Sequence, residues 1–164
     1  MRIVFVLLGA FALSACGLQP MYAGGGSGAV AQGLRGIEVT TIEGKAGWLV
    51  RQALIDRLGK PAEAGGEAPP YRLEIRLDDS LEGLAVLADD TVSRERRTLR
   101  ARYQLYDAQT GEVLLDATEG ADAGIDVVSS EYAVIAAENT ALENLSVEIA
   151  DRIVTRVALT LRKQ

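Results

Sequence analysis

The clearest pattern in the chain is an alternation of apolar and charged residues in residues 71–79, strict from Tyr71 to Asp78. The apolar positions are Tyr71, Leu73, Ile75 and Leu77. Such alternation predicts a strand with one buried and one exposed face. Further strands are predicted over residues 93–106 and 112–118, joined by a turn at residues 107–111 that ends in glycine. The three strands are expected to form an antiparallel meander, and residues 81–90 either extend the first of them or form an apolar loop.

Two other segments have the three- and four-residue spacing of amphipathic helices. The first is predicted over residues 47–58, with Gly59 as its stop. Its apolar positions are Trp48, Leu49, Leu54, Ile55 and Leu58. The second begins after Ser130, a candidate N-cap, and continues to the end of the chain without Gly or Pro. Its apolar positions are Ile135, Leu142, Leu145, Ile149, Ile153, Val157 and Leu161, widened by Val147, Ala150, Val154 and Ala158.

The apolar arc of the second helix is wide, at roughly 200°, where packing on one sheet needs about 100°. Either this helix also packs on the first helix, or it offers apolar surface to a partner. A short strand at residues 37–42 completes the order β-α-β-β-β-α. The sequence therefore predicts an α+β fold, a two-layer sandwich with two helices on one face of a mostly antiparallel four-stranded sheet.

The N-terminal segment has a different character. Arg2 precedes a run of apolar residues and glycine at residues 3–13, which suits a secretory signal and is too short to span a bilayer. Leu13 and two small residues then lead to Cys16, the only cysteine of the chain. This order is typical of a bacterial lipobox, in which the thiol receives a diacylglycerol group. The alternative is an ordinary secretory signal with an unrelated cysteine.

These features predict three parts of the chain. Residues 1–15 are a cleaved lipoprotein signal peptide, residues 16–34 a lipidated N-terminus with a Gly-rich tether, and residues 35–164 a single domain. A diacylglycerol and an N-acyl chain on Cys16 would anchor the protein stably, and no other cofactor is expected. Gly17 stands where lipoproteins retained in the enteric inner membrane carry aspartate, which favours the outer membrane.

Composition narrows the possible functions. The net charge is −6, and it becomes −7 when Arg2 leaves with the signal peptide, which argues against a nucleic-acid partner. The chain has no histidine, so the usual general base and the commonest metal ligand are missing. It also carries no catalytic serine motif and no phosphate-binding loop with lysine. We therefore expect a protein that is not an enzyme and holds no metal; the acidic pairs at residues 78–79 and 89–90 are expected to be solvated.

One charged cluster is unusual for so acidic a chain. Its members occupy alternate positions of the strand predicted over residues 93–106, with Thr98 between them, so they share one face on which alternate positions are about 6.8 Å apart. They are Arg94, Arg96, Arg100 and Arg102. The arginines either bind an anion such as phosphate, which suits the guanidinium fork, or pair with carboxylates on neighbouring strands. The candidate carboxylates are Glu74, Asp78, Glu112 and Asp116, and the two explanations are compatible.

The heptapeptide Cys16-Gly17-Leu18-Gln19-Pro20-Met21-Tyr22 resembles the start of alphaproteobacterial lipopolysaccharide-assembly lipoproteins of the LptE family. The predicted element order, the long closing helix and the charged third strand are similar to this family over nearly the whole mature chain. The resemblance implies a lipid-anchored protein at the periplasmic face of the outer membrane, which is not an enzyme.

The resemblance also implies two partners. The first is an LptD-type β-barrel, which the protein would plug one-to-one and help to assemble while lipopolysaccharide enters the outer leaflet. The second is lipopolysaccharide itself, bound through basic residues. The candidates for contact with the lipid-A phosphates are Arg94, Arg96, Arg100 and Arg102. An auxiliary lipoprotein of a phospholipid-transport system, binding acyl chains, is the alternative function.

Overall fold

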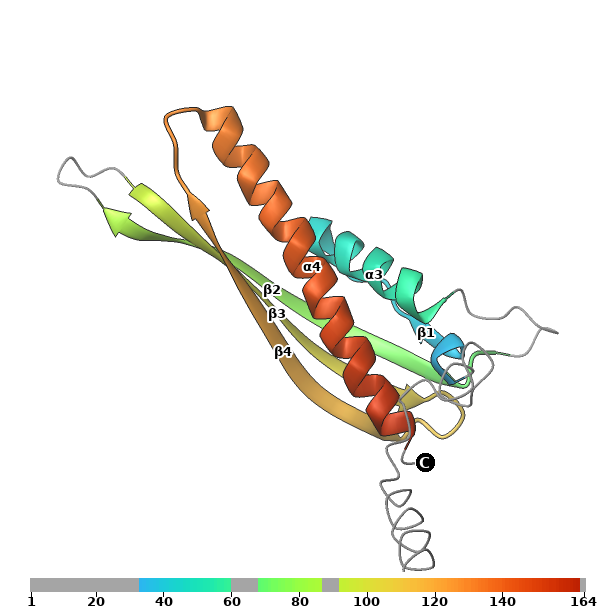
Figure 1. The fold of residues 1–164 in the computed structure, drawn as a ribbon. Coiled ribbons are helices and arrows are strands. Elements are labelled where there is room, and N and C mark those ends of the chain that lie inside the picture. The colour runs from blue at the N-terminus through green and yellow to red at the C-terminus, as the bar shows by residue number, and fades with distance from the viewer. Residues whose placement is uncertain (1–32, 60–67, 87–91, 163–164) are drawn as a thin grey trace, which may run out of the picture.

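The computed structural model describes residues 33–59, 68–86 and 92–162 (Figure 1). Its elements are β1 (Ile37–Val39), α3 (Gly44–Leu58), β2 (Tyr71–Val86), β3 (Val92–Asp107), β4 (Val113–Asp126) and α4 (Glu131–Leu161). The expected signal peptide and Cys16 lie outside the described residues. Leu34, predicted as the last residue of the tether, is buried in the core.

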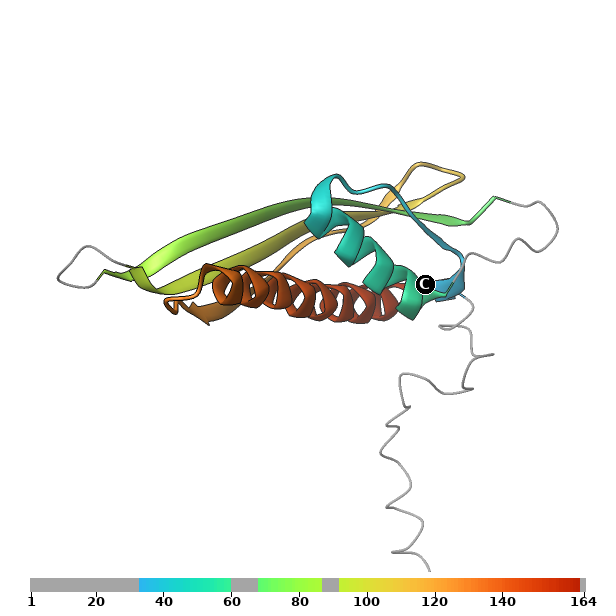
Figure 2. The same cartoon turned by 90° about the horizontal axis from the view of Figure 1, so that it is seen from above.

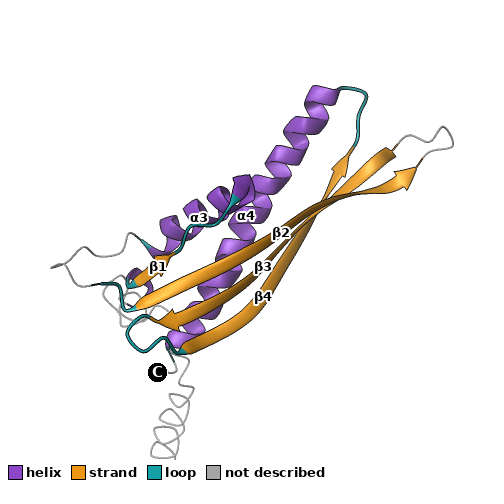
Figure 3. Ribbon diagram, turned by 180° about the vertical axis from the view of Figure 1, so that it is seen from behind, coloured by secondary structure: helices purple, strands orange, loops and turns teal. Residues whose placement is uncertain are grey.

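The four strands form one twisted sheet in the order β1-β2-β3-β4. β1 is parallel to β2, and the other neighbours are antiparallel. Both helices lie on the same face of the sheet, and no element among the described segments covers the opposite face (Figures 2 and 3). The predicted α+β two-layer fold is confirmed. We call the uncovered face the outer face.

Two strands are longer than the alternation in the sequence predicts. β2 continues to Val86, so residues 81–86 belong to the strand, and residues 87–91 lie outside the described part of the chain. β4 continues to Asp126, eight residues past its predicted end at residue 118. The extension contains two glycines and two alanines, which carry no strand signal of their own. Pairing with β3, in which Asp126 lies opposite Arg94, holds it in the sheet.

The core lies between α4, α3 and the inner face of the sheet. Its largest fully buried side chains include Leu73, Leu99, Tyr103, Leu105, Ile149 and Ile153. Along α4 the buried residues come in pairs every four positions, from Ala141 and Leu142 to Val157 and Ala158. A four-residue period drifts by about 40° per repeat on a helix of 3.6 residues per turn. The buried stripe therefore winds around α4 and follows the twist of the sheet.

Helix–helix packing accounts for the wide apolar arc of α4. The middle of α4 packs on α3 as well as on β4 and β3 (Figure 1). Arg57 of α3 donates from Nε and Nη2 to the carboxylate of Asp151 in α4, with the Nη2–Oδ2 distance at 3.1 Å. The explanation by helix–helix contact is confirmed.

Three predicted core positions are wrong. Trp48 of α3 is 62% exposed. Ile135 and Val147 of α4 are each 46% exposed. Exposed apolar residues on an amphipathic helix cannot be separated from core residues by spacing alone.

The predicted helix and turn boundaries have mixed outcomes. Gly59 ends α3 with a φ of +81° and donates its N–H to the carbonyl of Ile55 at 2.9 Å, as a C-terminal glycine should. Gly111 closes the β3–β4 turn with a φ of +74°. Ser130 stands at the N-cap of α4, but its side chain makes no capping hydrogen bond, so the predicted cap is wrong in that respect.

Candidate functional site: the arginine row on the outer face

The pleat of β3 separates its side chains as the alternation predicts. Leu99, Ala101 and Tyr103 are buried towards the helices. The arginine row, which we define as Arg94, Arg96, Arg100 and Arg102, is exposed on the outer face. The structure therefore brings the four candidate residues together along one strand. Their role in binding stays a prediction.

The two ends of the arginine row are paired with carboxylates of β4. Arg94 donates from Nε to Oδ1 of Asp126 at 3.0 Å, and Arg102 donates from Nη2 to Oδ2 of Asp116 at 3.1 Å. The hydrogen bond from Arg102 holds the pKa of Asp116 below its usual range. Asp116 was among the expected partners. Asp126 was not, because β4 was predicted to end before it.

The middle of the row is different. Arg96 and Arg100 have no ion pair within the described residues, although Glu82 and Asp78 of β2 lie opposite them in register. On the β4 side they lie opposite Gly124 and Gly120, which have no side chains.

These two glycines leave room beside the unpaired guanidinium groups. A Cβ placed on Gly120 would lie 3.6 Å from Cγ of Arg100, so this arginine rests over the glycine backbone. A Cβ placed on Gly124 would have nothing within 4 Å. The centre of the row therefore presents two arginines that form no ion pair within the described residues, on a surface that is open on the β4 side.

A network of hydrogen bonds lies next to Arg102, at one end of the arginine row. Gln104 donates to Asp116 at 2.8 Å and accepts a hydrogen bond from Tyr106 at 2.8 Å. The guanidinium of Arg72 lies 5.1 Å from the centre of the Tyr106 ring, a cation–π contact. A hollow of about 150 Å³ is lined by Glu74, Arg76, Arg102 and Gln104. It is small, so the exposed row rather than this hollow is the surface for a large anionic ligand.

Arg97 was not singled out from the sequence, because it alternates away from the arginine row. It lies on the helix-facing side and forms a bidentate pair with Asp79 of β2, at 2.8 and 2.6 Å. Its Nη1 also donates to the backbone carbonyl of Glu138 in α4 at 3.1 Å. The hydrogen bond with Asp79 raises the pKa of Arg97. This arginine joins two strands and the long helix and is not available to a ligand.

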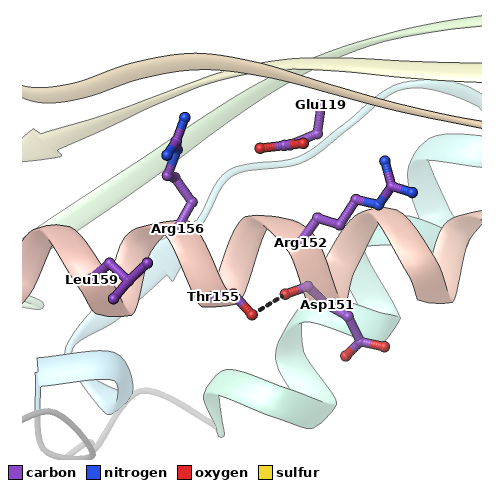
Figure 4. Close-up of a pocket in the computed structure, with 6 residues that line it drawn as sticks. All are labelled: Glu119, Asp151, Arg152, Thr155, Arg156 and Leu159. Carbon is purple, nitrogen blue, oxygen red and sulfur yellow. Dashed lines mark hydrogen bonds between the residues drawn. The ribbon is translucent and has the colours of Figure 1, made fainter. Parts of the chain in front are cut away.

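A second hollow of about 400 Å³ lies between β4 and α4, on the helix side of the sheet (Figure 4). Glu119 comes from β4, and Arg152 and Arg156 come from α4. Arg152 donates to the carbonyl of Gly120 and to Glu148. Because the lining carries both signs of charge, the hollow has weaker preference for anions than the arginine row.

Beside this hollow the hydroxyl of Tyr103 is buried without a hydrogen-bond partner within the described part of the chain. Burial raises the pKa of Tyr103 to about 12, with a smaller contribution in the same direction from Glu119. Arg156 lies near the hydroxyl and opposes that rise.

The described residues contain neither a metal-binding cluster nor a membrane-spanning helix. They contain no cluster of three or more His, Cys, Asp or Glu side chains that could hold a metal ion. Nor do their helices include one that is both long and apolar enough to cross a membrane.

The family model for lipopolysaccharide assembly, LptE, matches residues 34–157, which is most of the chain and the whole of the sheet. The chain belongs to the LptE family. This confirms the resemblance seen in the sequence and connects the chain with lipopolysaccharide assembly. No curated protein matches the chain.

Three of the solved structures similar to this LptE-family chain are described as lipoproteins. A putative lipoprotein from Caulobacter crescentus CB15 is 26% identical with a TM-score of 0.64, over 83% of this chain and 97% of that one. A minor lipoprotein from Acinetobacter baumannii is 14% identical, with a TM-score of 0.59 over 75% and 90% of the two chains. Rare lipoprotein B from Shewanella oneidensis is 17% identical, with a TM-score of 0.50 over 76% and 92%. The last two share the fold.

Proposed function

We propose that this LptE-family chain is an outer-membrane lipoprotein, anchored at the periplasmic face through lipids on Cys16, that plugs an LptD-type β-barrel one-to-one. It helps to assemble that barrel and assists lipopolysaccharide insertion into the outer leaflet. Its arginine row binds the lipid-A phosphates. Membership in the family supports the role in lipopolysaccharide assembly, and the polar outer face suits the polar interior of a barrel.

The observation that carries the binding proposal is the pair of unpaired arginines, Arg96 and Arg100, beside the side-chain-free surface of β4. A guanidinium group binds phosphate oxygens through two parallel hydrogen bonds. The net charge of −6 means that attraction is local to the row and does not come from the protein as a whole. The arginines would compete with the divalent cations that bridge lipopolysaccharide molecules and so separate one molecule from an aggregate.

The test compares two double variants of the lipidated full chain in detergent, using purified lipopolysaccharide as the ligand. Arg96→Gln with Arg100→Gln removes the unpaired charges. Arg94→Gln with Arg102→Gln removes the same charge from the paired ends. Loss of two charge-assisted contacts should weaken binding by about tenfold or more in the first variant, against about threefold or less in the second. Equal losses, or none, in folded variants would reject the assignment.

The barrel partner is tested separately. The chain is extracted from the native envelope in mild detergent and recovered through a C-terminal tag. A heat-modifiable barrel at one-to-one stoichiometry would support the plug. An inner-membrane transporter, or no partner, would contradict it and favour the phospholipid-transport alternative. That alternative was motivated by the wide apolar arc of α4, for which packing on α3 now accounts.

A further inference from the structure

β1 pairs with only the first part of β2, at Tyr71 to Leu73. The N–H of Tyr71 donates to Gly36, and the carbonyl of Leu73 accepts from Thr40, so the backbone groups of these two residues face β1. Alternate residues of a strand direct their N–H and C=O groups to the same side. The residues that face this edge beyond Leu73 are Ile75, Leu77, Asp79, Leu81 and Gly83. In the described segments nothing forms a backbone hydrogen bond with them on this side.

This free edge of β2, residues 75–83, is only partly protected: it carries charged residues, but its inward-pointing Asp79 is neutralised by Arg97. It contains no Lys or Pro, and its bulge comes only after Gly83. On the opposite edge of the sheet, Arg152 of α4 binds the outward carbonyl of Gly120 in β4. β1 ends well before the far end of β2 (Figure 3). Leu81 and Leu84, at that end, are 43% and 44% exposed. A strand edge with unpaired backbone N–H and C=O groups is a template for another strand.

The charges on the free edge are complementary to themselves. Arg76 and Glu82 are exposed on the outer face, and neither has an ion pair within the described part of the chain. If two copies pair antiparallel about Asp79, Arg76 of each copy lies opposite Glu82 of the other. On the inner face, Leu77 of each copy then lies opposite Leu81 of the other, which covers apolar surface.

Neighbouring registers are unfavourable. Centring the pair on residue 78 places Glu74 opposite Glu82, and centring it on residue 80 places Asp78 opposite Glu82, so like charges meet. A centre at residue 77 places residue 81 of one copy against Leu73, where β1 already occupies the edge. A centre at Asp79 pairs Ile75 with Gly83, so the paired stretch must end at Gly83, where the β2 register shifts begin. In the favourable register the two Asp79 side chains approach each other, but each is already held by Arg97.

We infer that two copies of this chain associate through the free edge of β2, in antiparallel register about Asp79, to form one continuous sheet. The contact is short compared with the standard interface of about 1,600 Å², so the dimer forms in a concentration-dependent equilibrium. The inference concerns the chain outside a barrel, because a one-to-one plug has no room for a second copy, and it leaves the arginine row uncovered.

Sedimentation equilibrium of the lipidated full chain, in density-matched detergent over a range of protein concentrations, tests the dimer. The wild type should show a monomer–dimer equilibrium. Arg76→Glu and Glu82→Arg each create two like-charge contacts per dimer and should weaken association by about tenfold or more. Combining the two substitutions restores opposite charges and should restore association. Asp122→Arg makes a similar charge reversal on the outer face of β4 and should have no effect.

A wild type that stays monomeric at every concentration would overturn the inference. So would a dimer that survives both single substitutions, or one that the combined variant fails to restore. Circular dichroism of each variant establishes that it is folded. Because Arg76 and Glu82 are both exposed, these substitutions disturb no buried contact.

Discussion

Replacing Arg97 by methionine should loosen the contact between the sheet and the first turns of α4. In the wild type this side chain binds Asp79 at 2.8 and 2.6 Å and the carbonyl of Glu138 at 3.1 Å. Methionine keeps much of the aliphatic volume but removes all three hydrogen bonds. It also leaves the Asp79 carboxylate without its partner in a partly enclosed position.

The size of the effect follows from burial. The Arg97 and Asp79 side chains are only 16% and 26% exposed. Breaking a fully buried pair costs about 3–5 kcal/mol, and an exposed pair contributes about 1 kcal/mol or less. We therefore expect Arg97→Met to lower the free energy of unfolding by about 2 kcal/mol. For a domain of this size that corresponds to a fall of about 8 °C in Tm.

The assay is a double-mutant cycle of Arg97→Met and Asp79→Asn, measured by urea unfolding. The double variant should be little less stable than the worse single variant, giving a coupling energy of about 1–2 kcal/mol. Arg94→Met is the matched control. It breaks an Arg–Asp pair on the same strand, but its side chains are 61% and 76% exposed, so the loss should stay below about 0.5 kcal/mol.

Hydrogen exchange gives a second measure that a general loss of stability would not mimic. Amides in residues 131–140 should lose more protection in Arg97→Met than those near the C-terminus of α4. The reasoning would be refuted if Arg97→Met and Arg94→Met cost the same, or if the coupling energy with Asp79 were zero.

Three further predictions concern buried or paired groups. Tyr103→Phe should leave the protein as stable at pH 7 or more stable by about 1 kcal/mol, because the hydroxyl is buried without a partner. Burial raises the pKa of Tyr103 to about 12, so the wild-type free energy of unfolding should fall as pH rises from about 10 to 12. Urea unfolding of Tyr103→Phe over the same pH range should lack the part of this fall that comes from the Tyr103 hydroxyl. Arg57 lowers the pKa of Asp151, so the ion pair stabilises the fold above about pH 4 and this stabilisation is lost as pH falls further. The difference in unfolding free energy between the wild type and Asp151→Asn should therefore shrink below about pH 4. A difference that is constant with pH would contradict this prediction. Gly47→Ala places a Cβ 2.6 Å from the Ile42 carbonyl oxygen and should cost about 1–3 kcal/mol in thermal unfolding, whereas Gly124→Ala, with nothing within 4 Å, should cost nothing.

The arginine row shows how far local pattern carries a prediction. The alternation in residues 93–106 was sufficient to place the four arginines on one face, because side chains of a strand alternate whatever lies beside it. It could not decide which arginines are paired. That depends on β4, whose register places Asp126 beside Arg94 but Gly124 and Gly120 beside Arg96 and Arg100.

The sequence by itself determined the order of the elements, the β3–β4 turn, the stop of α3 at Gly59 and the two faces of β3. Each of these depends on residues close together in the chain. Only the tertiary structure decided the full lengths of β2 and β4, the Arg97–Asp79 contact and the free edge of β2. These depend on strand register and on the shortness of β1, which are set by contacts between distant segments rather than by any local pattern.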